Sequence, residues 1–172
     1  MTRPRSAVLV ACCLLAAATR PGAAGADEPP AIEHQPPLCT VAGQPLALCA
    51  AISDDGTVAA ARVYFRRAGE AYYAFVNMAF TGVGYCGTLP APLPRTKAIE
   101  YYVQAVDDAY QPTRTSTFRL PVQPEGACEF PPLEKDKERA AAIRVFATNQ
   151  RQGRHLDDGF AAGGVTFVPA AH

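Results

Sequence analysis

The stretch AIEYYVQAV, residues 98–106, decides the fold of this chain. Apolar and polar side chains alternate along it with a period of two residues. Because successive side chains of a β-strand point to opposite faces of a sheet, this alternation predicts a strand with one face buried in a core. The predicted inward residues are Ile99, Tyr101, Val103 and Ala105, and the predicted outward residues are Glu100, Tyr102 and Gln104.

Six further strand-like runs lie around this stretch, separated by Gly, Asp and Pro turn signals. A first strand is expected after the proline-rich segment 27–38, and the others cover residues 45–52, 61–67, 71–80, 82–92 and 115–122. Run 71–80 carries apolar side chains at both parities, so its inward face stays open. The clearest inward sets are Leu46, Leu48, Ala50 and Ile52, then Ala61, Val63 and Phe65, and finally Phe118, Leu120 and Val122. Seven short strands within residues 27–123 predict an all-β fold, a two-sheet antiparallel β-sandwich.

Three of these segments carry a resemblance to a known family. SDDGTVAAARVYFR (53–66), GYCGTLPAP (84–92) and IEYYVQAVDD (99–108) look like strands B to C, E and F of the immunoglobulin-like and fibronectin type III-like β-sandwich domains of bacterial exported proteins. The resemblance implies an immunoglobulin-like sandwich in which Tyr101 is the tyrosine corner. The chain has no Trp, so the buried Trp of antibody domains is absent. This architecture hosts many unrelated roles and does not by itself indicate a function.

Residues 1–26 have the composition of a secretory signal peptide. A basic start is followed by the apolar run AVLVACCLLAAAT and by the small-residue step Ala24-Gly25-Ala26. The apolar run is shorter than the roughly 20 residues that span a bilayer, so cleavage before Asp27 is expected. In a competing interpretation, residues 9–12 are a lipobox and Cys12 carries a lipid anchor. The mature protein is therefore expected to be secreted or periplasmic, without a membrane span.

The charge balance of the mature chain argues against nucleic acid as a partner. Loss of residues 1–26 removes Arg3, Arg5 and Arg20 and no acidic residue, so 13 basic residues face 16 acidic ones. Nucleic-acid binding depends on neutralising many phosphates, and the sequence shows no basic stripe that would do so. A mildly acidic exported protein without this partner is the expectation.

Four cysteines remain after cleavage: Cys39, Cys49, Cys86 and Cys128. An even number of cysteines in an exported chain predicts disulfides. A metal site is the alternative, but it would need close Cys pairs and a neighbouring His, and the sequence has neither. Two disulfides are expected, with all three connectivities open.

Residues 124–172 are predicted to be a linker and a short C-terminal extension. The linker holds Cys128, and residues 133–142 have a helix-forming composition. Apolar alternation at residues 143–147 and again at Val165 and Phe167 predicts a small hairpin. A disulfide from Cys128 to any other cysteine would fasten this extension to the sandwich.

Two acidic pairs are the candidate metal site. One turn holds Asp54 and Asp55, and another holds Asp107 and Asp108. In the immunoglobulin-like topology both turns lie at one end of the sandwich, where their carboxylates could bind Ca²⁺. The alternative, which the sequence favours, is turn chemistry, because Asp bonds nearby backbone groups and tolerates turn dihedrals. No cofactor is expected. The pair Asp157 and Asp158 in the extension is a weaker candidate for the same kind of site.

Exposed tyrosines are the candidate binding residues. Tyr64 and Tyr102, together with Tyr72 or Tyr73, are expected to point away from the core on neighbouring strands, where they would contact sugar rings or a protein. The alternative is cross-strand packing covered by the C-terminal extension.

The sequence offers little material for catalysis. The mature chain has two serines, neither in a nucleophile elbow, and its histidines His34, His155 and His172 lie far apart without zinc-site spacing. We therefore expect a non-enzymatic exported domain that engages a protein or cell-envelope component. The alternatives are a calcium- or carbohydrate-dependent adhesion module and an accessory domain of an enzyme system.

Overall fold

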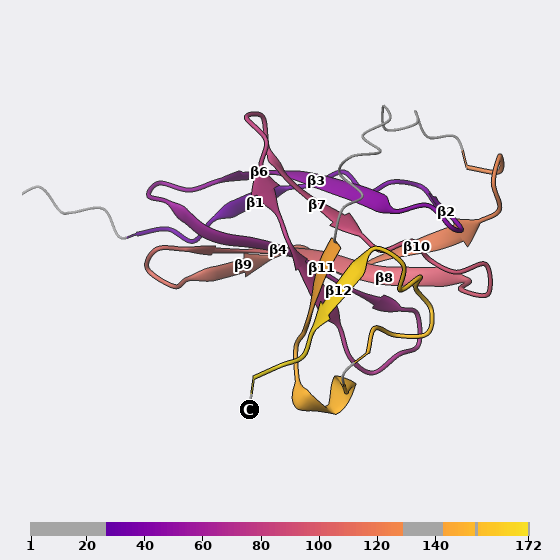
Figure 1. Ribbon diagram of the computed structural model, residues 1–172. Coiled ribbons are helices and arrows are strands. Elements are labelled where there is room, and N and C mark those ends of the chain that lie inside the picture. The colour runs from indigo at the N-terminus through magenta and orange to yellow at the C-terminus, as the bar shows by residue number, and fades with distance from the viewer. Residues whose placement is uncertain (1–26, 129–142, 154, 172) are drawn as a thin grey trace, which may run out of the picture.

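The computed structural model describes residues 27–128, 143–153 and 155–171. The predicted signal peptide and residues 133–142, whose composition is helix-forming, lie outside these described residues. Within them the protein is all-β, and Figure 1 shows its two sheets as layers that lie over one another. The smaller, antiparallel sheet contains, in spatial order, β1 (Ala31–Glu33), β3 (Leu46–Ser53), β7 (Tyr85–Leu89) and β6 (Ala79–Phe80).

The larger sheet is mixed. Its spatial order is β12 (Val165–Val168), β11 (Ile143–Ala147), β5 (Ala74–Asn77), β4 (Val58–Arg67), β8 (Ala98–Asp107), β10 (Phe118–Gln123) and β2 (Thr40–Val41), and β9 (Pro112–Arg114) also pairs with β8. The pairs β10 with β2 and β11 with β12 are parallel, and the other pairs are antiparallel. The prediction of an all-β, two-sheet sandwich is confirmed, with parallel pairing added at both ends of the larger sheet.

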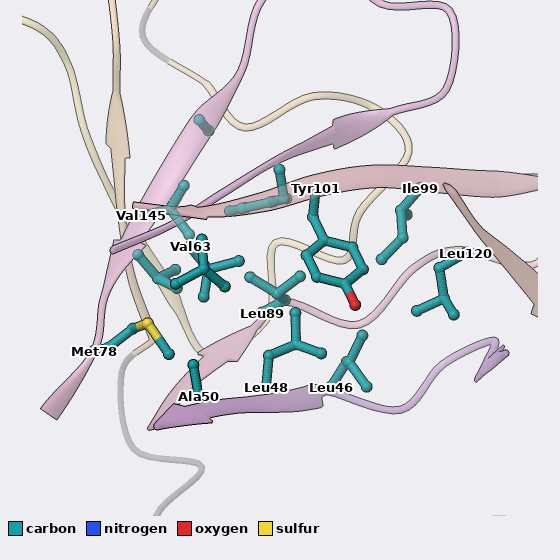
Figure 2. Close-up of a cluster of buried hydrophobic side chains, with 14 of the residues drawn as sticks. Leu46, Leu48, Ala50, Val63, Met78, Leu89, Ile99, Tyr101, Leu120 and Val145 are labelled. Carbon is teal, nitrogen blue, oxygen red and sulfur yellow. The ribbon is translucent and has the colours of Figure 1, made fainter. Parts of the chain in front are cut away.

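The two sheets enclose one core, and β8, which contains the stretch AIEYYVQAV, supplies its centre. Ile99, Tyr101, Val103 and Ala105 are all buried, as the two-residue alternation predicts. Figure 2 shows Leu46, Leu48 and Ala50 of the smaller sheet pointing at side chains of the larger one. The inward sets of residues 61–67 and 115–122 also face this core. Burial of this apolar surface is the main source of stability, at about 25 cal/mol per Å².

Run 71–80 contributes a strand to each sheet. Its first part, β5, pairs with β4, and its last part, β6, pairs with β7 of the smaller sheet. Met78 lies between the two and is buried in the core. Ala74, Val76 and Met78 all face the core, but Tyr73 and Phe75 on the opposite face are apolar as well, so both parities look apolar in sequence.

The predicted C-terminal hairpin is wrong, because β11 and β12 pair in parallel. A tight hairpin would make them antiparallel, but the connection between them, residues 148–164, is long and contains a short 3-10 helix, Gln150–Gln152. β11 then pairs with β5, so the extension continues the larger sheet. Val145 is fully buried, and Phe160 packs edge-on against Phe65 with centroids 5.0 Å apart.

The expectation of two disulfides is confirmed. Cys49 and Cys86 are directly opposed on β3 and β7, and they are bonded. Cys39 is bonded to Cys128, which ties the segment before β2 to the segment after β10. Within the described ranges, no helix has the length and apolar character needed to cross a membrane.

Candidate binding surface on the outer face of the larger sheet

The two candidate tyrosines lie in one row of side chains on the outer face of the larger sheet. Tyr64 is directly opposed to Tyr102 on one side and to Phe75 on the other, and Phe75 is opposed to Phe146. Each ring has a buried valine next to it in sequence, so the alternation of the strand turns the ring outward. These buried neighbours are Val63, Val76, Val103 and Val145. We call the four rings the aromatic stack.

The rings of the aromatic stack are packed against each other. Tyr102 and Tyr64 are stacked, with centroids 4.8 Å apart and planes inclined by 6°. Phe75 and Phe146 are stacked at 5.0 Å and 15°, and Tyr64 joins the two pairs through a tilted contact of 5.3 Å with Phe75. Such contacts stabilise a sheet by about 0.5–1.5 kcal/mol each beyond their buried area. The aromatic stack therefore connects the four strands β8, β4, β5 and β11.

Arginines cover the ring faces that remain around this column. Each guanidinium carbon lies 4.3–5.6 Å from a ring centroid, within the range of a cation–π attraction. The contacts are Arg114 over Tyr102, Arg62 over Phe75, Arg144 over Phe146, and Arg66 over Tyr73, whose ring meets Tyr102 edge-on. The surface thus combines planar rings with planar cations.

The outer face is basic, in contrast to the mildly acidic composition of residues 27–172, which hold 13 basic and 16 acidic residues. Among the described residues, its strands carry five arginines and one carboxylate: Arg62, Arg66, Arg114, Arg119, Arg144 and Glu100. Glu100 accepts ion pairs from Arg66 at 2.7 Å and from Arg119 at 3.0 Å. Within the described part of the chain, no carboxylate makes a salt bridge with Arg62, Arg114 or Arg144. In the described part of the chain, Arg114 and Arg144 are exposed and can donate to an anionic partner, whereas Arg62 is half-buried and its Nε is shielded from solvent.

This packing changes what the tyrosines can bind. A sugar ring stacks on the open face of an aromatic ring, but the faces of Tyr64 are occupied by Tyr102 and Phe75. Burial raises the pKa of Tyr102, the neighbouring Tyr64 adds to the rise, and Arg114 opposes it. Tyr102 therefore stays a neutral phenol at physiological pH. The face offers ring edges, hydroxyls and guanidinium groups, which suit carboxylates better than neutral sugars.

Of the two interpretations of the tyrosines, the binding role stays a prediction. Cross-strand packing is present, and Phe146 of the C-terminal extension takes part in it. The extension contributes along the edge of the sheet, through β11, and both Tyr64 and Tyr102 stay partly exposed. Tyr72 is exposed, whereas Tyr73 packs on Tyr102.

The acidic residues do gather at one end of the sandwich. Val58, just after the Asp54 turn, is opposed to Asp107, and an atom placed as Cβ on Gly56 would lie 3.2 Å from Asp108 Oδ1 and 3.4 Å from Asp54 Oδ2. Turn chemistry is visible as well, because the Gly56 N–H donates to Asp54 Oδ2 at 3.1 Å and the Gln111 N–H donates to Asp107 Oδ1 at 2.6 Å.

Partial burial raises the pKa of Asp54. The Gly56 hydrogen bond opposes this rise, and the charges of Asp107, Asp55 and Asp27 add to it. Among the described residues, no three His, Cys, Asp or Glu side chains are arranged to hold a metal ion. The cluster is therefore electrostatically strained without forming a cation cage.

The two described histidines, His34 and His155, lie in different surroundings. His34 contacts the Cys49 carbonyl oxygen at 2.7 Å and the Tyr101 hydroxyl at 2.9 Å, so it acts as a structural bridge. The tyrosine corner implied by the family resemblance would bond backbone, whereas Tyr101 meets a side chain. His155 and Asp157 line two adjoining open hollows of about 200 and 360 Å³. His172 lies outside the described residues.

Several residues of this surface were not identified from the sequence as binding candidates. Alternation along residues 61–67 turns Arg62 and Arg66 outward, but the sequence does not show which side chains of other strands they contact. Phe75 lies in the run whose parity was open. Phe146 and Arg144 lie in the extension, whose partner strand cannot be read from local pattern.

Comparison with known proteins adds no relative. No protein-family model matches the chain, and no curated protein matches its sequence. The geometry of this surface is therefore the best guide to what the protein binds.

Proposed function

We propose that this protein is a non-enzymatic exported binding domain, whose outer face on the larger sheet engages an acidic segment of a protein or cell-envelope component. The observation that carries the proposal is the aromatic stack with its arginines, three of which have no salt bridge among the described residues. Arginine binds carboxylates through planar, paired hydrogen bonds, and the rings hold the guanidinium groups in place.

An exported location and an immunoglobulin-like domain are parts of this proposal. The two disulfides support export, because such bonds persist in oxidising compartments. The two-sheet architecture supports a rigid scaffold, since it holds the arginines on paired strands and not on loops. A cofactor has no part in this function.

Binding to two carboxylate polymers tests the proposal and separates the two partner types. Poly-L-glutamate represents an acidic polypeptide, and polygalacturonate represents an acidic polysaccharide. We expect the mature protein to bind at least one of them, with an affinity that falls as salt rises, because the contacts are between opposite charges. A neutral dextran is expected not to bind, which distinguishes charge recognition from sugar stacking.

A charge-matched pair of variants locates the surface. Arg114→Gln with Arg144→Gln removes two arginines from the face, whereas Lys97→Gln with Arg151→Gln removes two exposed cations elsewhere. The first variant is expected to weaken binding about fivefold or more, and the second by less than about twofold. Equal losses in both variants, or unchanged binding in the first, would contradict the assignment. A calcium-dependent or dextran-dependent rise in melting temperature would favour the adhesion alternative.

A further inference from the structure

Two buried carboxylate oxygens at the acidic end lack a partner. The Asp107 side chain is fully buried (0 % exposed), and its Oδ2 has no hydrogen bond among the described residues. The Oδ1 atom of Asp54 is shielded from solvent and is equally without a partner there. A buried carboxylate without a counter-charge destabilises the fold, so a cation at this end of the sandwich would stabilise it.

The N-terminal segment of the described chain lies beside these carboxylates. The Gln111 side chain donates from Nε2 to the Asp27 carbonyl oxygen at 3.1 Å and to Asp27 Oδ2 at 2.6 Å. The backbone N–H of the same glutamine donates to Asp107. Asp27 is also close enough to Asp54 for its charge to raise the Asp54 pKa. One residue, Gln111, therefore holds Asp27 next to the unpaired oxygens.

The path of the chain keeps Asp27 in this position. Pro30 is fully buried, and Ala31 pairs with Ser53 at the end of β3. The segment 27–31 thus passes from the turn after β8, in the larger sheet, to the smaller sheet. It crosses the end of the sandwich where Asp54 and Asp107 lie.

We infer that the α-ammonium group of Asp27, created when residues 1–26 are removed, is the counter-ion of the buried Asp107 and Asp54 carboxylates. Hydrolysis of the Ala26–Asp27 peptide bond by an export endopeptidase consumes one water. It leaves a carboxylate on Ala26 and an amine on Asp27, which takes up a proton near neutral pH. Processing thereby adds a positive charge and three donors at the place where the oxygens lack partners.

An ammonium group suits this end better than a divalent metal. Among the described residues, the charges that raise the Asp54 pKa come from Asp107, Asp55 and Asp27, and Asp108 lies close to Asp54 beside Gly56. Their side chains do not converge as a metal cage within the described residues. An α-ammonium needs only two acceptors at hydrogen-bond distance, and it is already tethered to the segment that Gln111 holds. Removal of the signal peptide then completes the fold in addition to releasing the protein.

The test compares two forms of the mature chain that differ by one residue. One form begins at Asp27, and the other carries a single Ala before Asp27, which moves the α-ammonium away and leaves a neutral amide. Both are made in the native sequence and with Asp107→Asn, and Asp54→Asn is used if the first substitution prevents folding. We expect the added Ala to lower the melting temperature by about 3 °C or more, and this difference to disappear in the Asn variant.

The chemical reactivity of the terminal amine is a second readout. A free α-amino group has a pKa of about 7.7–8.0, so a partly neutral fraction reacts with acylating reagents at pH 7. Ion pairing to Asp107 is expected to slow this reaction about tenfold in the form that begins at Asp27, and the Asp107→Asn substitution should restore it.

Three results would overturn the inference. The first is equal melting temperatures and equal amine reactivity in the two forms. The second is an exported protein whose first residue, by mass spectrometry, is not Asp27. The third is recovery of the lost stability in the Ala-extended form on addition of Ca²⁺, with no effect of Ca²⁺ on the form that begins at Asp27, because this would identify a metal as the natural counter-ion.

Discussion

Tyr64 and Tyr102 lie face to face across β4 and β8, with ring centroids 4.8 Å apart and planes inclined by 6°. They are directly opposed in register, so the contact follows from the pairing of the two strands. Because Tyr64 also meets Phe75, the contact joins the centre of the larger sheet to the strands at its edge.

A double-mutant cycle measures this contact. Tyr64→Ala and Tyr102→Ala are each expected to destabilise the protein, and the double variant should lose less than the sum of the two. The expected coupling free energy is about 1 kcal/mol, as for other stacked aromatic pairs. Urea unfolding provides the measurement. Tyr64→Ala combined with Tyr85→Ala, which lies in the smaller sheet, is the additive control, and additivity in the Tyr64 and Tyr102 cycle would contradict the stacking.

Tyr101 is expected to make stability fall at high pH. Its side chain is fully buried, burial raises its pKa, and its hydroxyl bonds His34. Above the ordinary tyrosine pKa of about 10, the unfolded chain ionises while the folded chain keeps a neutral phenol, so stability is present below that pH and declines as pH rises. Tyr101→Phe should reduce this dependence and cost about 1 kcal/mol at neutral pH through the lost hydrogen bond. Denaturant unfolding at several pH values tests both effects, and an unchanged alkaline slope would contradict this explanation.

The two disulfides are expected to be separately important. Paired replacement of Cys49 and Cys86 by Ala, or of Cys39 and Cys128 by Ala, should lower the free energy of unfolding by about 2–4 kcal/mol each, because each bond restricts a long loop of the unfolded chain. Reduction of the native protein should lower its melting temperature markedly. Peptide mapping checks the pairing, and the finding of four free thiols in oxidised protein would refute it.

The C-terminal extension is expected to be needed for the stability of the whole sandwich. Phe160 is buried against Phe65, and its replacement by Ala should cost about 3–5 kcal/mol, as for other buried aromatic residues. Phe80→Ala is the matched control, because Phe80 is 63 % exposed and should cost no more than about 1 kcal/mol. Equal, small losses in both variants would show that the extension is dispensable for stability.

Much of the candidate site was accessible from sequence as single residues but not as a surface. Alternation placed Tyr64 and Tyr102 outward, and both lie on the outer face. The Asp54 and Asp107 turns were expected at one end of the sandwich, and they do meet there. What alternation could not supply was register across strands, which brings Phe75 and Phe146 beside them.

The sequence by itself determined the all-β class, the inward residues of the clearly alternating strands and the presence of disulfides. These features are local or compositional: a two-residue period reports which side of a strand is buried, and an even number of cysteines in an exported chain indicates pairing. The tertiary structure alone decided the disulfide connectivity, the parallel pairing of β11 with β12, and the assembly of the aromatic stack. Each of these depends on which distant segments meet. That choice is made by the packing of the whole core, and no short stretch of the chain encodes it.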